Sequence, residues 1–98
     1  MDTKKELTWL NTMLNTLLGS LTSTLEVMKE SNEPSKKIGA AFCLNTAVNY
    51  SISSMGVINE KFQKLTKVSM NEEETKKYSS IVNKKKAIEK FIQKYKGL

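Results

Sequence analysis

The sequence predicts an all-α fold, an antiparallel three-helix bundle of long helices. Apolar residues recur at steps of three and four along most of the 98 residues, which is the spacing of amphipathic helices. One proline and four glycines are too few to form the turns that many short strands would need. Two short breaks divide the chain, so we expect one domain with helices over residues 3–30, 35–66 and 70–96. We place the second helix at the centre, with dimerisation as one way to complete the core.

The first predicted helix carries a narrow seam of leucines. Thr3 and Glu6 have the spacing of a capping box, which marks a helix start. The leucines that follow share one face about 100° wide, whereas the polar side is neutral instead of charged. Because Asn and Thr are poor helix formers, this helix depends on tertiary packing. The seam consists of Leu7, Leu10, Leu14, Leu17, Leu18, Leu21 and Leu25.

Trp9 lies off the leucine seam, on the same side as Met13 and Val27. A tryptophan in this place either folds over the edge of the bundle or belongs to a contact surface for another chain, since Trp is enriched at interface hot spots. Asn49 and Ser53 lie on the small, neutral remainder of the second helix. We therefore take these five residues as the candidate protein interface.

The second predicted helix follows a break at Pro34, because proline suits the first turn of a helix. Residues 38–59 contain no charge, and their apolar side chains form two stripes that span more than half of the circumference. Such a helix should be covered on two or more sides. We therefore expect Cys43 to be a buried structural thiol, and Gly39 and Gly56 to mark close packing or a kink. The first stripe is Ala41, Leu44, Val48, Ile52, Met55, Ile58, Phe62 and Leu65, and the second is Ala40, Cys43, Ala47, Tyr50 and Val57.

The third predicted helix is rich in lysine. It opens with Ser69 and Glu72, again at capping-box spacing. Residues 56–98 hold eleven lysines and five glutamates, and so carry the whole net charge of +6. Lysines that recur along one side of this helix either form a solvated face or bind an anionic partner. The candidate anionic-partner face consists of Lys76, Lys86, Lys90 and Lys94.

The residues that are missing exclude most catalytic chemistry. The chain has no histidine, and Asp2 is its single aspartate. The commonest general base and the Ser-His-Asp arrangement are therefore absent. The sequence also contains no glycine-rich phosphate loop and no zinc-ligand spacing. We expect a protein that is not an enzyme and that uses no metal, no cofactor and no small-molecule substrate.

The N-terminal residues and the single cysteine indicate the cellular compartment of the protein. A basic N-terminus before a leucine-rich run is typical of a signal peptide, but Asp2 and Glu6 lie in the basic part and Asn11 interrupts the apolar part. Asn, Ser and Thr recur through both uncharged stretches, which argues against membrane spans. A single cysteine suits a reducing compartment. We expect a cytoplasmic protein.

Three functions are compatible with these patterns. The first, which we favour, is a small protein-interaction module of the adaptor, inhibitor, immunity or phage and plasmid accessory type that associates with itself. The second is a non-specific nucleic-acid binder that uses the lysine face, although the absence of arginine removes bidentate contacts to bases and phosphates. The third is a membrane-surface protein that protects against a membrane-active peptide.

Overall fold

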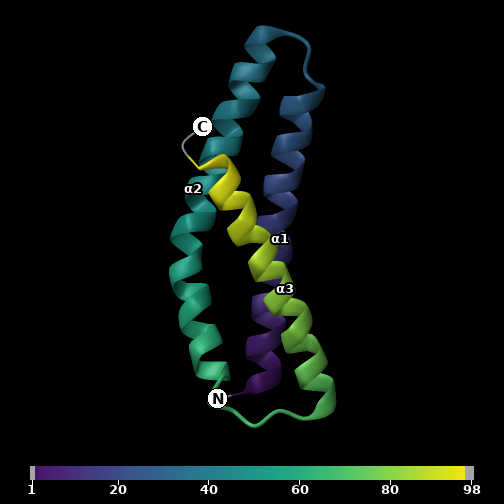
Figure 1. Cartoon of the computed structure of the whole chain (residues 1–98), viewed down its shortest axis with the longest axis vertical. Helices are drawn as coiled ribbons and strands as arrows, with labels where there is room; N and C mark the ends of the chain where they lie inside the picture. The colour runs from purple at the N-terminus through teal and green to yellow at the C-terminus, as the bar shows by residue number, and fades with distance from the viewer. Residues whose placement is uncertain (1, 97–98) are drawn as a thin grey trace.

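In the computed structural model, which describes residues 2–96, the chain forms three helices and, within those residues, no strand. α1 is Thr3–Glu30, α2 is Pro34–Leu65 and α3 is Glu72–Tyr95. Successive helices run antiparallel, and α3 leans across the hairpin formed by α1 and α2 (Figure 1). The molecule is a rod of 52 × 21 × 18 Å. The predicted all-α three-helix bundle is confirmed.

α1 is capped by a residue that precedes the predicted capping box. The carboxylate of Asp2 accepts a hydrogen bond from the backbone N–H of Lys5 at 3.2 Å. The prediction that Thr3 and Glu6 cap each other is therefore wrong, because aspartate is among the best N-cap residues and is placed one position earlier. The Glu6 carboxylate is instead engaged by Lys61 of α2.

α3 begins with a capping box, but two residues later than predicted. The side chain of Asn71 accepts a hydrogen bond from the Glu74 backbone N–H at 2.8 Å, and the Glu74 carboxylate accepts one from the Asn71 N–H at 3.1 Å. Ser69 lies in the connection before this helix. Asparagine caps as well as serine does, and a start at Asn71 places Glu72, Glu73 and Glu74 in the first turn, where the helix dipole stabilises negative charge.

The core follows the predicted leucine seam. Five of its leucines are buried, and Leu18 and Leu25 are half-buried at the edge. Ser51 is the one buried polar side chain among the described residues, and its hydroxyl donates to the carbonyl of Ala47 at 2.9 Å. The core cluster consists of Leu7, Leu10, Leu14, Leu17, Leu21, Leu44, Val48, Met55, Ile58, Phe62, Leu65, Ile81, Ile88 and Ile92.

The central helix is α1, whereas the sequence had indicated the second helix. α1 packs extensively against both of its neighbours, and α2 and α3 touch each other only over a short length. The polar contacts between helices also connect α1 to each neighbour. Glu6 of α1 accepts a hydrogen bond from Lys61 of α2, and Asn11 of α1 accepts one from Lys84 of α3. The physical reason is that a narrow leucine seam is fully buried when two helices converge on it, whereas the wider apolar arc of α2 is left partly uncovered.

Part of the second apolar stripe of α2 faces solvent, although Ala40 is buried and Ala47 is half-buried. The expectation that α2 is covered on two or more sides is therefore wrong for the single chain. Tyr50 and Val57 are exposed by 59% and 50%. Cys43 is also exposed, and the prediction of a buried structural thiol is therefore wrong. In this fold α1 and α3 both lie on one side of α2, and no described segment lies over the other side.

Candidate interaction surface

α2 carries two helix-packing seams, of which its own chain occupies one. The buried seam follows the first stripe except at Ile52, which is exposed. A second set of residues recurs at alternating steps of four and three on the outer side. Alternation of three and four is the spacing by which one helix packs along another. Every member of the second set is exposed. We call this set the outer seam; it consists of Gly39, Cys43, Thr46, Tyr50, Ser53 and Val57.

Exposed hydrophobic side chains lie on the α1–α2 hairpin, and Tyr50 and Val57 among them belong to the outer seam. Within the described residues, all six large hydrophobic side chains that are exposed belong to the α1–α2 hairpin, and α3 has none. Two of them, Ile38 and Phe42, are each exposed by 72%. Single exposed apolar residues are normal, but a contiguous apolar patch marks an interaction site. The six are Val27, Ile38, Phe42, Tyr50, Ile52 and Val57.

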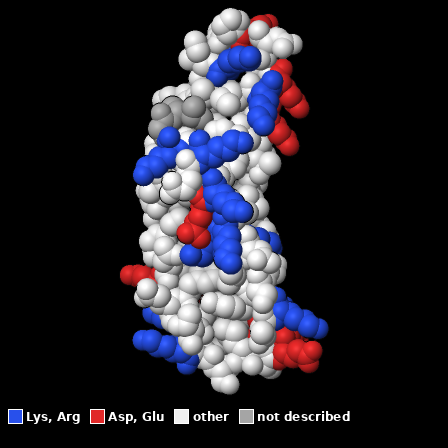
Figure 2. All heavy atoms as spheres, viewed as in Figure 1, with Lys and Arg blue, Asp and Glu red and all other residues white. Residues whose placement is uncertain are grey.

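The outer seam is also free of charge along its whole length. No lysine or glutamate lies between residues 38 and 59, and the facing part of α1, residues 7–25, is equally uncharged. The lysines of the chain therefore lie at the ends of the hairpin and on α3. In Figure 2, which views the α3 side, blue side chains line α3 while the flank formed by α2 is largely white.

An apolar groove lies between α1 and α2 at the end of the hairpin that α3 does not reach. Its volume is about 400 Å³, and its walls are mostly apolar. Val27 and Ser23 of α1 form one wall, and Gly39 and Cys43 of α2 form the other. Val27, predicted as an interface residue, is thus joined to the outer seam through this groove. The Cys43 thiol lies where the groove meets the seam.

Trp9 lies at the opposite end of the hairpin and is half-buried against the core. The Lys61 ammonium group is 4.7 Å from the centre of the Trp9 ring and 2.7 Å from the Glu6 carboxylate. This arrangement ties α1 to α2 through a cation–π contact and an ion pair. Met13 is likewise half-buried against the core. The structure therefore separates Trp9 and Met13 from the outer seam.

Asn49 and Ser53, the predicted interface residues of the second helix, are both exposed. Ser53 belongs to the outer seam, and Asn49 lies beside it. The sequence reasoning missed Ile38, Phe42 and Tyr50 as surface residues. Tyr50 belonged to the predicted second stripe, which had been interpreted as part of the core, whereas Ile38 and Phe42 had been placed on neither stripe.

The four lysines of the candidate anionic-partner face are exposed on α3. Lys76 forms an ion pair of 3.7 Å with Glu72, one turn earlier. Lys86 and Lys90 form no ion pair within residues 2–96, and the Lys94 ammonium group lies 5.4 Å from the centre of the Tyr95 ring. The structure thus leaves a positive ridge along the C-terminal half of α3, visible as the central blue line in Figure 2.

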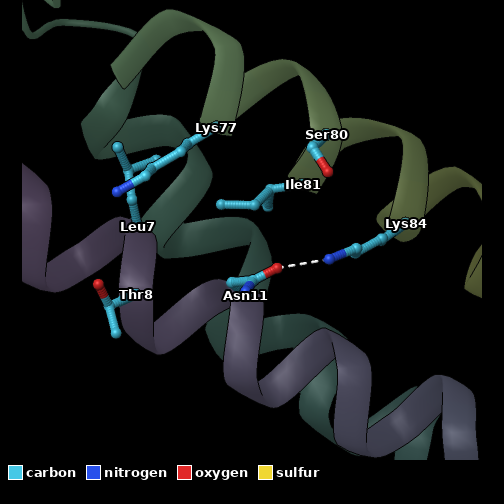
Figure 3. Close-up of a pocket in the computed structure, with 7 residues that line it drawn as sticks. All are labelled: Leu7, Thr8, Asn11, Lys77, Ser80, Ile81 and Lys84. Carbon is cyan, nitrogen blue, oxygen red and sulfur yellow. Dashed lines mark hydrogen bonds between the residues drawn. The ribbon is translucent and has the colours of Figure 1, made fainter. Parts of the chain in front are cut away.

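A smaller pocket of about 260 Å³ lies between α1 and α3, and Figure 3 shows its lining residues. The Lys84 ammonium group crosses it and donates to the side-chain oxygen of Asn11 at 2.5 Å. Lys77 is 3.6 Å from the carboxylate of Glu73. Because both ammonium groups are engaged by the chain itself, this pocket serves as a polar contact between two helices.

No group of His, Cys, Asp and Glu side chains within the described residues has the arrangement of a metal site. None of the helices of residues 2–96 combines the length and the apolarity needed to cross a membrane. Comparison of the chain with protein-family models, with curated proteins and with solved structures finds no match in any of the three. A functional proposal is therefore based on the exposed residues of the chain.

Proposed function

We propose that this chain is a non-catalytic protein-interaction module that binds another helix along the outer seam of α2. The observation that carries the proposal is the presence on α2 of a second, exposed seam with helix-packing spacing, flanked by Ile38 and Phe42. Burial of one such large side chain contributes about 1.5–3 kcal/mol. A partner helix that covered several of them would gain enough to offset the cost of association.

Two further features support this proposal. Gly39 and Gly56 lie inside α2, where each lowers helix stability by about 1 kcal/mol relative to alanine. A β-carbon at either position would meet no atom of the chain within 4 Å, so the fold itself does not require glycine there. Gly39 belongs to the outer seam, where the absence of a side chain allows an external helix to approach closely. An exposed Cys43 thiol is in keeping with action in a reducing compartment such as the cytoplasm.

Site-specific photo-crosslinking in the cells that produce the protein tests the proposal. A benzophenone amino acid replaces Thr46 on the outer seam or, as the matched control, Ser79 on the outer side of α3; both positions are exposed in helices. We expect a discrete protein adduct from position 46 and none from position 79. Equal labelling at the two positions, or no adduct from position 46, would contradict the proposal.

A second candidate function is electrostatic binding of nucleic acid along α3. It is favoured by the net charge of +5 over residues 84–96. It is also favoured by Lys86 and Lys90 of the positive ridge, which form no ion pair within residues 2–96. Contacts of this kind would be to the phosphate backbone, and their affinity falls steeply with salt. Lys86→Glu with Lys90→Glu should abolish retention of the protein on immobilised DNA at low salt. Retention of that variant would exclude this candidate.

A further inference from the structure

Resting on the proposed function, we infer that the partner helix is α2 of a second copy of this chain, packed antiparallel along the outer seam. The outer seam is self-complementary about its midpoint, which lies at the height of residue 48 along the helix axis. When two copies of α2 pack antiparallel with these midpoints side by side, each seam residue faces a seam residue of the other copy. The two residue numbers of each facing pair sum to 96. Gly39 then faces Val57, Cys43 faces Ser53, and Thr46 faces Tyr50 of the other copy.

Each of these layers fits together in size and chemistry. Gly39, Ser53 and Thr46 are small, and they face the larger Val57, Cys43 and Tyr50. Alternation of small and large side chains across facing positions allows two helices to interdigitate. All six side chains are exposed and uncharged in the single chain, so no ion pair has to be broken to form the contact.

The same register gives charge complementarity at both ends of the seam. The next layer outward brings Lys36 opposite Glu60 of the other copy, once at each end. Within residues 2–96, Glu60 has no ion pair, and Lys36 has only a loose one of 3.8 Å with the exposed Glu33. The lysines of the positive ridge belong to α3 and not to α2, so none of them is a seam residue.

The outer seam is short compared with a standard stable interface. From Gly39 to Val57 the seam is about 27 Å long, and the molecule is only 21 × 18 Å across. The contact therefore covers roughly 500 Å² per copy, below the ~800 Å² per partner of a standard stable interface. We therefore expect a weak, reversible dimer.

Disulfide trapping tests the register. The Ser53→Cys variant, which retains Cys43, places the introduced thiol opposite Cys43 of the second copy at two symmetric places. Within one chain the two positions are about 15 Å apart on a continuous helix, which is beyond the ~7 Å reach of a disulfide. Any disulfide between them therefore joins two copies.

Three proteins serve as controls: the unmodified chain, Ser53→Cys combined with Cys43→Ser, and Ser79→Cys with Cys43 retained. In the proposed register, like positions on the two copies are also about 15 Å apart. Under mild oxidation we expect Ser53→Cys to form covalent dimer about tenfold faster than each control. Equal rates for all four proteins would overturn the inferred register.

Sedimentation across the micromolar range tests the association itself. Thr46→Glu places a like charge near the centre of the contact twice, and should raise the dimer dissociation constant about tenfold or more. Ser79→Glu is the matched control and should leave it unchanged. A strictly monomeric chain would overturn this inference, while adducts to a different protein from position 46 would still support the proposed function. Absence of every adduct would overturn both.

Discussion

Replacement of the two exposed glycines inside α2 by alanine should stabilise the monomer. Gly39 and Gly56 both lie in the interior of Pro34–Leu65, and an added β-carbon meets no atom of the chain within 4 Å at either position. The methyl group therefore creates no clash and gains no burial. What remains is the difference in intrinsic helix preference, which is about 0.8–1.0 kcal/mol in favour of alanine for each substitution.

The two effects should add, because the positions are about 25 Å apart along the helix and share no neighbour. Gly39→Ala with Gly56→Ala should therefore raise the free energy of unfolding by about 1.6–2.0 kcal/mol. For a domain of this size the melting temperature should rise by about 6–16 °C. Urea and thermal unfolding, followed by circular dichroism at concentrations where the chain is monomeric, measure both quantities.

Gly19→Ala provides the matched control, since Gly19 is an exposed helical glycine of α1 that also has free space around it. It should stabilise the monomer by about 0.8–1.0 kcal/mol. If Gly19→Ala stabilises the chain and the two α2 substitutions do not, then the α2 glycines are required within the single chain. That result would refute the assignment of Gly39 to an external contact.

Three other predictions concern the core, a helix cap and the outer seam. Leu14→Ala removes a fully buried side chain of the central helix and should lower the free energy of unfolding by about 2–5 kcal/mol, measured by urea titration. Asn71→Ala removes half of the capping box of α3 and should cost about 1 kcal/mol in the same assay, with a loss near zero arguing against the cap. Cys43 is exposed, so a thiol reagent should modify it in the native monomer as fast as in urea. Protection of the thiol from the reagent that grows with protein concentration would indicate self-association. Protection in the dilute monomer would contradict the structure.

The helices themselves could be predicted from the sequence because each depends on local chemistry. Pro34 fixes the start of α2 through its ring geometry, and the spacing of leucines fixes the buried face of α1. Cap residues were harder to predict, since Asp2 and Asn71 compete with neighbours of equal capping ability. At α3 the cap is Asn71, which also places Glu72, Glu73 and Glu74 in the first turn.

The surface could not be predicted, because apolar spacing does not say which stripe of a helix will be covered. Val48 and Tyr50 belong to different stripes of α2, and both stripes have helix-packing periodicity. The structure buries Val48 and exposes Tyr50, since α1 and α3 both approach α2 from the Val48 side. The arrangement of α1 and α3 is a property of the whole fold, so the sequence indicated a second apolar stripe but not that Cys43, Tyr50 and Val57 of that stripe would be exposed.

The short reach of α3 along the rod has a consequence for how the molecule opens. α3 covers the end of the hairpin near Trp9, whereas the turn between α1 and α2 extends beyond it (Figure 1). Regions with few tertiary contacts open at lower free energy than the rest of a domain. Amide hydrogens on both sides of the turn should therefore exchange with solvent earlier than those near Leu10 and Ile58, which are fully buried. Because Trp9 is the single tryptophan and lies at the covered end, its fluorescence should not respond to this early opening.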